Sequence, residues 1–201
     1  RHINDGTFGI TGECKLLSPD EIERLEKHEL DKIDLLYWRN SKIDFDSLSN
    51  LVSSLEKKTN NEFLKRISDC EDEKVLKFLT KNNSELKIKH SKDFIKTLWE
   101  CCQIPDFSKK AYGNHIEVVK KVFEFLTSKS GKVTNDYMKK QLEHLDRYDG
   151  NIDTLANRIS NVRTWSYVAN KKNWANNSDY WIERTKYIED KLSDKLHEEL
   201  T

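Results

Sequence analysis

Arginine and aromatic side chains recur at helical spacing between residues 149 and 174, and they are the first candidates for chemistry in this chain. At about 100° per residue, Leu155, Ile159 and Val162 form one apolar stripe. Two arginine–aromatic pairs border it, Arg158 with Trp165 on one flank and Arg163 with Tyr167 on the other. Guanidinium groups reach phosphates, and both planar groups stack on bases. The pattern predicts either a contact surface for single-stranded nucleic acid or amphipathic side chains at the rim of a helical core.

Further arginine–aromatic neighbours occur at Tyr37-Trp38-Arg39 and at Arg147-Tyr148. Arg39 joins Arg158 and Arg163 as a candidate phosphate contact. For these three arginines an internal pairing with a carboxylate is an equal alternative, because a guanidinium fits either acceptor. The tryptophans Trp99, Trp174 and Trp181 continue apolar helix faces, which favours the core.

Other constellations that could carry catalysis are absent from the sequence. Ser130-Gly131-Lys132 lacks the upstream glycine and the following Ser or Thr of a phosphate-binding loop. The six His are scattered, and the four Cys form no C-x-x-C pair, so we expect free thiols and no metal site. Adjacent Cys101 and Cys102 lie on a tryptophan-bearing helix, where buried inert thiols are expected. We therefore expect no catalytic residues and no cofactor in this chain itself.

Charge and hydrophobicity limit the class of protein. The 201 residues carry 35 Lys+Arg and 35 Asp+Glu, which excludes a globally basic nucleic-acid binder but permits a local basic groove. Only 36% of residues are hydrophobic, so we expect a lean core and surface that rests on a partner. No apolar run is long enough to span a membrane, and no signal peptide is evident. We expect a cytoplasmic protein that does not bind membranes and, since it begins with Arg1, a fragment of a longer one.

Capping signals and apolar periodicity predict an all-α fold, a multi-helix bundle of about eight helices with a short N-terminal β segment. We expect three parts: residues 1–17 with short strands that end a preceding domain, a helical subregion at 18–88, and a C-terminal helical bundle at 89–201. Helices are expected over the following ranges: 18–28, 46–55, 69 or 72 to 79, 91–102, 114–126, 134–145, 152–169 and 178–200. The apolar cluster at 35–38 is expected in a buried turn or short helix.

Three stretches together resemble one family: RHINDGTFGITGEC at the start, LWECCQIPDF at 98–107, and DGNIDTLANRISNVRTWSYVANKKNW with its continuation IERTKYIEDKLSDKLHEELT. They are similar to the region C-terminal to the motor core in superfamily 2 DExH RNA helicases of the mitochondrial-degradosome type and their bacterial relatives. The resemblance is strongest over 91–201. Within 18–90 it is limited to the WRN-x-x-x-D-F segment and general helicity.

The resemblance implies a parent protein whose two RecA-like domains bind ATP and Mg²⁺, with this helical region closing over a channel for single-stranded RNA, or alternatively DNA. It implies that Arg1 is the last arginine of an ATP-site motif, a nucleotide-binding residue only in the intact parent. The expected partners are RNA, the RecA-like domains and an exoribonuclease. The nucleotide-binding and DExH motifs are missing here, so the chain is expected to be inactive by itself. The alternative is a helical docking module for a nuclease partner or for self-association.

Overall fold

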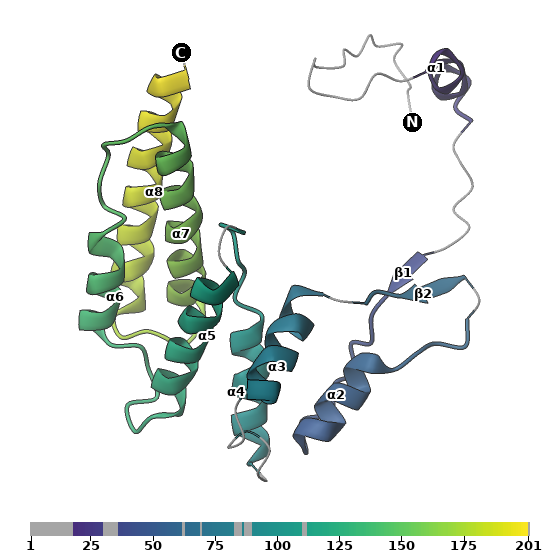
Figure 1. Ribbon diagram of the computed structural model, residues 1–201, viewed down its shortest axis with the longest axis horizontal. Helices are drawn as coiled ribbons and strands as arrows, with labels where there is room; N and C mark the ends of the chain where they lie inside the picture. The colour runs from purple at the N-terminus through teal and green to yellow at the C-terminus, as the bar shows by residue number, and fades with distance from the viewer. Residues whose placement is uncertain are drawn as a thin grey trace.

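The computed structural model describes most of the chain after residue 17. The described residues are 18–29, 36–61, 63–68, 70–82, 86, 90–109 and 112–200. Among them are eight helices and a two-stranded sheet, which confirms the expected mostly helical fold (Figure 1). The helices are α1 Pro19–Glu26, α2 Leu48–Glu56, α3 Glu71–Asn82, α4 Lys92–Cys102, α5 Tyr112–Thr127, α6 Asn135–Glu143, α7 Ile152–Asn170 and α8 Ser178–Leu200. The expectations for 1–17, including Arg1, lie outside the described residues.

Side-chain caps begin several helices where the sequence predicts them. Ser91 accepts a hydrogen bond from the Phe94 backbone at the start of α4, and Thr134 accepts one from Tyr137 at the start of α6. Asn151 caps α7 in the same way. Each cap satisfies an N–H group that a helix end otherwise leaves unpaired. These short-range bonds explain why helix starts in the C-terminal half are close to their predicted positions.

The two strands contradict the expectation for the 35–38 cluster. Leu36–Trp38 forms strand β1, which pairs in parallel with β2, Leu64–Arg66, over three residues. Leu36 is 52% exposed and Tyr37 71% exposed, so this segment is neither a helix nor a buried turn. A strand formed by pairing with residues almost thirty positions away leaves no local periodicity in the sequence.

Helices α7 and α8 form a hairpin with α6 alongside it (Figure 1). The predicted apolar stripe of α7 is confirmed, since Leu155 and Val162 are fully buried and Ile159 is 6% exposed. The extensive packing of α7 is against α8, whereas Thr164 of α7 donates a hydrogen bond from its hydroxyl to the Pro105 carbonyl just beyond α4.

The start of α6 is fixed to the turn between α7 and α8. The Val133 N–H donates to the Trp174 carbonyl at 2.7 Å, and the Asn176 N–H donates to the Val133 carbonyl at 3.0 Å. The indole N–H of Trp181 donates to the Asn135 side chain at 3.0 Å. These bonds hold α6 against α8, so the loop that follows α6 runs beside the α7–α8 hairpin.

Two apolar residues on amphipathic helix faces are exposed. Ile22 of α1 is 43% exposed, and α1 stands apart from the other helices in Figure 1. Leu200 is 62% exposed at the end of α8, where the hairpin partner Ile152 is also exposed. In both places the amphipathic pattern is present but no described element covers it.

One buried cluster extends from Leu51 in α2 to Leu192 in α8 and includes side chains from both expected helical subregions. Cys101 and Cys102 lie in it, and burial raises the pKa of both thiols. The protonated thiol is a poor nucleophile. Among the described residues, no helix combines the length and apolar composition needed to cross a membrane.

Candidate nucleic-acid interface

Arg158 of α7 binds the chain's own backbone. Its guanidinium donates to the Arg147 carbonyl at 2.7 Å and to the Asp149 carbonyl, and it lies 3.8 Å from the Asp149 carboxylate. Only 13% of its side chain is exposed. The structure therefore places Arg158 as the residue that holds the loop between α6 and α7 against the hairpin.

Trp165, expected at the rim of α7, lies in the core instead. It is 4% exposed and packs edge-on against Tyr137 of α6, with ring centroids 5.8 Å apart. The helical wheel placed this ring on the flank of the apolar stripe, but α6 covers that flank. A stacking platform needs an open ring face, and in this structure Trp165 presents almost none.

Arg163 and Tyr167 lie on the opposite flank of α7. The Arg163 side chain is half exposed, and its Nε donates to Glu189 of α8 at 2.7 Å. Tyr167 is partly buried, and the Lys171 ammonium lies 5.2 Å from its ring centre. The Arg158–Trp165 pair and the Arg163–Tyr167 pair therefore lie on opposite flanks of α7 and do not form one surface.

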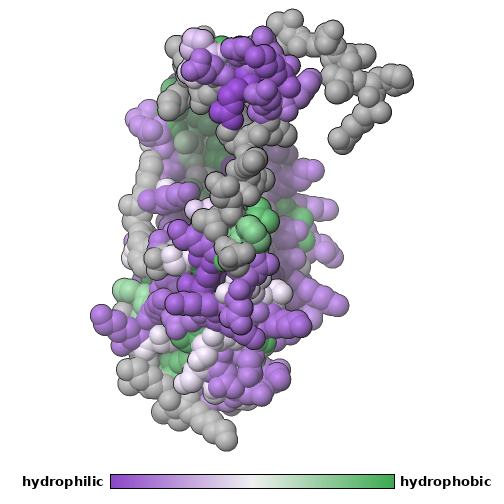
Figure 2. All heavy atoms as spheres, turned by 90° about the vertical axis from the view of Figure 1, so that its right-hand side faces the viewer, coloured by the Kyte–Doolittle hydropathy of each residue, from purple (hydrophilic) through white to green (hydrophobic). Residues whose placement is uncertain are grey.

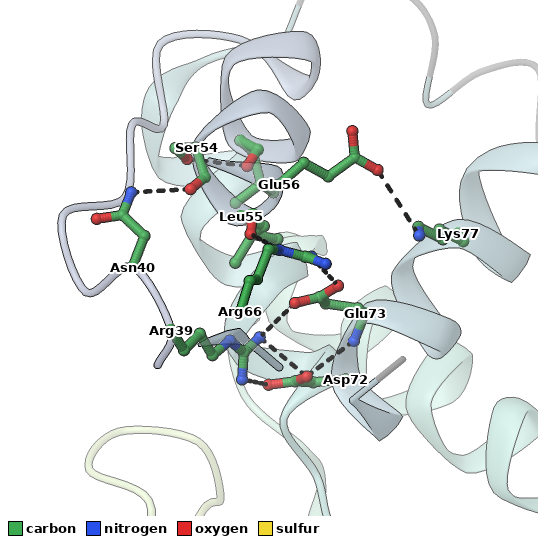
Figure 3. A network of polar contacts seen from close by, with 10 residues as sticks. Arg39, Asn40, Ser54, Leu55, Glu56, Arg66, Asp72, Glu73 and Lys77 are labelled. Carbon is green, nitrogen blue, oxygen red and sulfur yellow. Dashed lines mark hydrogen bonds and ion pairs between the residues drawn. The ribbon is translucent and has the colours of Figure 1, made fainter. Parts of the chain in front are cut away.

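Arg39 belongs to a partly buried ion cluster, seen from close by in Figure 3. Its two terminal nitrogens donate to the two carboxylate oxygens of Asp72 at 2.9 and 3.0 Å, and the guanidinium lies 5.3 Å from the Trp99 ring centre. Burial alone lowers the pKa of Arg39, but the hydrogen bond and charge of Asp72 outweigh it and raise that pKa. The terminal nitrogens of this arginine are therefore bonded to Asp72, and its flat face is stacked near Trp99, both within the chain.

Glu73 completes the ion cluster, where its carboxylate lies between Arg39 and Arg66 (Figure 3). It is 2% exposed and accepts a hydrogen bond from Arg66 at 2.7 Å, while Arg39 lies 3.6 Å away. Arg66 also donates to the Leu55 carbonyl at the end of α2. These bonds join β1, β2, α2 and α3, so the cluster is a structural junction.

A set of exposed tyrosine and basic side chains lies on α8, on a face the sequence expectation did not include. Tyr180 is 57% exposed and Tyr187 51% exposed. Arg184 and Lys191 lie above the Tyr187 ring, 5.5 and 6.0 Å from its centre. Positions 180, 184, 187 and 191 fall within about 60° of one another on a helical wheel. They therefore form one continuous stripe along α8.

The loop between α6 and α7 extends this stripe. Arg184 is ion-paired with Asp146, which also accepts the hydroxyl hydrogen bond of Tyr148. Burial, and then the Asp146 hydrogen bond, raises the pKa of Tyr148, so its hydroxyl stays a donor. Arg147 is 62% exposed beside Asp149. We call these residues the tyrosine–arginine face: Arg147, Tyr148, Tyr180, Arg184, Tyr187 and Lys191.

The tyrosine–arginine face combines exposed rings with basic side chains. The two exposed rings are seven residues apart on α8, about 10 Å along the axis. That distance spans about three nucleotides of a stacked strand. Asp146 and Asp149 balance Arg184 and Arg147, whereas Lys191 has no carboxylate partner among the described residues. Ring stacking is therefore the main interaction this face offers, with a modest charge contribution.

Four of the six residues of this face could have been found in the sequence. Tyr180, Arg184, Tyr187 and Lys191 follow one another at helical spacing, but the buried stripe of the same helix was the stronger pattern. Arg147-Tyr148 was noted as an arginine–aromatic neighbour, but its position beside α8 depends on the Arg158 and Asp146 bonds. Only folding brings the loop and the helix together.

The described residues include no group of three or more His, Cys, Asp or Glu side chains placed to hold a metal ion. Comparisons of the chain with protein-family models, with curated proteins and with solved structures found no match.

Proposed function

We propose that this chain is the accessory C-terminal helical region of an ATP-dependent RNA helicase and helps to form its channel for single-stranded RNA. The observation that carries the proposal is the tyrosine–arginine face. It offers two exposed rings at nucleotide-scale spacing beside basic side chains, the combination used in sequence-independent single-strand binding. The sequence resemblance of residues 91–201 supplies the protein class.

In this proposal the chain has no catalytic activity of its own. ATP and Mg²⁺ bind the RecA-like domains of the cytoplasmic parent, which this region contacts, and an exoribonuclease is a further partner. Single-stranded DNA is the alternative ligand. The binding residues proposed from the structure are those of the tyrosine–arginine face. Arg163 and Tyr167 remain a second candidate set on the other flank of α7, and Arg158 is assigned to positioning the loop.

Binding of a fluorescein-labelled twelve-nucleotide oligouridine tests the proposal. We expect the chain to bind it weakly and Tyr187→Ala to weaken the affinity about 5- to 150-fold, the equivalent of one lost stacking contact. Tyr37→Ala is the matched control, since Tyr37 is an exposed tyrosine of β1. No binding by the unaltered chain, or equal losses in the two variants, would contradict the proposal.

A protein-docking role is the second candidate, and exposed apolar residues favour it. Five large hydrophobic side chains in or near β1, β2 and α3 are at least 37% exposed: Leu36, Tyr37, Phe63, Ile67 and Phe78. Figure 2 shows hydrophobic patches interrupting a mostly hydrophilic surface on the side that bears α2 and the small sheet. Analytical ultracentrifugation tests self-association: a tight dimer without oligouridine affinity would favour docking over strand binding.

A further inference from the structure

A polar cavity lies between α5, α7 and the loop that follows α4, away from the tyrosine–arginine face. Its volume is about 230 Å³, below the usual ~300–1,000 Å³ of pockets for drug-sized ligands. Its polar lining includes Asp106, Asn114, His115, Asn157, Asn161 and Thr164. On α7, positions 157, 161 and 164 are on the side opposite the stripe that packs on α8.

Asp106 brings a negative charge to the cavity. Its Oδ1 accepts three hydrogen bonds from the loop: from the Ser108 N–H at 3.1 Å, the Ser108 hydroxyl at 2.9 Å and the Lys109 N–H at 3.0 Å. These bonds fix the carboxylate's orientation. Its Oδ2 has no hydrogen-bond partner among the described residues, so one acceptor remains for a ligand.

The two asparagines of α7 add further acceptor capacity. Asn161 donates from Nδ2 to the Asn157 backbone carbonyl at 2.7 Å, which leaves its Oδ1 open. The Asn157 side-chain amide has no hydrogen-bond partner within the described part of the chain. Water can reach these open acceptors, and a ligand that brings hydrogen-bond donors can take its place.

His115 supplies a neutral acceptor deeper in the cavity. It is 8% exposed. Burial lowers its pKa, and the opposing effects of Asp106, Glu71 and the Ile104 backbone do not reverse that shift. The imidazole is therefore neutral at pH 7 and offers one acceptor nitrogen when its other nitrogen is protonated towards the Ile104 carbonyl.

We propose that this cavity binds a small free compound bearing a protonated amino group. The ammonium is placed at Asp106 Oδ2, with the open side-chain acceptors of α7 and His115 available for its remaining N–H groups. The lining contains Asp106 and no lysine or arginine among the described residues, which disfavours an anion. A transition metal is disfavoured because Asp106 and His115 are the only carboxylate, imidazole or thiolate groups among the described residues of that lining.

The inference is tested on the full chain with propylamine as the probe and 1-propanol as its uncharged analogue, by isothermal titration calorimetry at pH 7. Propylamine binding that Asp106→Asn weakens at least tenfold supports the proposal. Asp106→Asn keeps the acceptor for the loop bonds but removes the charge. The matched control Asp153→Asn, which removes an exposed carboxylate at the start of α7, should bind as the unaltered chain does.

A second variant keeps the test decisive if Asp106→Asn does not fold. Asn161→Leu fills part of the cavity with apolar atoms, so it should abolish propylamine binding while leaving oligouridine binding unchanged. Three results would overturn the proposal: no propylamine binding by the unaltered chain, equal binding of 1-propanol, or undiminished propylamine binding in a folded cavity variant. None of these results depends on the oligouridine affinity, so the two proposals can fail separately.

Discussion

Two arginine–aromatic contacts of nearly equal geometry have opposite surroundings in this molecule. The Arg39 guanidinium lies 5.3 Å from the Trp99 ring centre, and the Arg184 guanidinium lies 5.5 Å from that of Tyr187. Trp99 is 3% exposed, whereas Tyr187 is 51% exposed. The first contact belongs to a structural junction, and the second lies on an open surface. Such a pair therefore does not by itself indicate a binding site.

The difference follows from what surrounds each arginine. Asp72 and Glu73 begin α3 and approach Arg39 together, so the guanidinium is matched by carboxylates in a desolvated place. Arg184 has Asp146 alone and keeps 37% of its side chain exposed. Desolvation makes a paired charge costly to unpair, while solvent screens an exposed pair. Stability should depend on the first cluster and ligand binding on the second.

The largest expected effect is on stability, from Glu73→Ala in the ion cluster. Removing this buried carboxylate leaves Arg66 without its carboxylate partner, and we expect the free energy of unfolding to fall by about 3–5 kcal/mol. Urea denaturation followed by circular dichroism measures it. Glu117→Ala, which removes an exposed helix pair with Lys120, should cost less than about 1 kcal/mol. Similar losses in both variants would show that the buried ion cluster matters no more for stability than an exposed pair does.

Arg39→Lys should have an intermediate effect. Lysine keeps the charge but cannot make the two-pronged contact with Asp72, so we expect a loss of about 1–3 kcal/mol in the same denaturation experiment. Oligouridine affinity should not change. A weakened affinity at unchanged stability would instead assign Arg39 to nucleic-acid contact.

Arg184→Ala should have the opposite effect, with little change in stability and a loss of oligouridine affinity. Because its ion pair is partly exposed, we expect a stability change within about 1 kcal/mol. Oligouridine affinity should fall, since Arg184 lies above the Tyr187 ring and beside the loop. Fluorescence anisotropy measures the affinity. A stability loss as large as that of Glu73→Ala would show that the exposed contact is also structural.

The smallest expected effect is on the salt dependence of binding. If Lys191 contacts a phosphate, Lys191→Ala should reduce the slope of log affinity against log salt by about 0.7 for a single strand. Arg158→Ala should leave the slope unchanged, because its guanidinium is bound to backbone carbonyls. A slope that changes with Arg158 and not with Lys191 would return Arg158 to the interface.

The helical part of the fold was predictable because its determinants are local. The buried stripe of α7, the Ser91, Thr134 and Asn151 caps, and the 178–200 range of α8 all follow from residues within a few turns of one another. The site was less predictable. Arg158 and Trp165 were predicted as neighbours on one flank of α7, but the bonds and packing that bury them come from α6 and its loop.

The amino-acid sequence by itself determined which segments are helical and which helix faces are apolar, because periodicity and capping act over a few residues. Only the tertiary structure decided which arginines pair with groups of the chain itself. Whether a guanidinium meets a carboxylate, a backbone carbonyl or solvent depends on segments distant in sequence, as with Arg39 and Asp72 or Arg184 and Asp146. Burial then sets how firmly each contact is held, which is why similar arginine–aromatic pairs serve as a structural junction in one place and as an exposed face in the other.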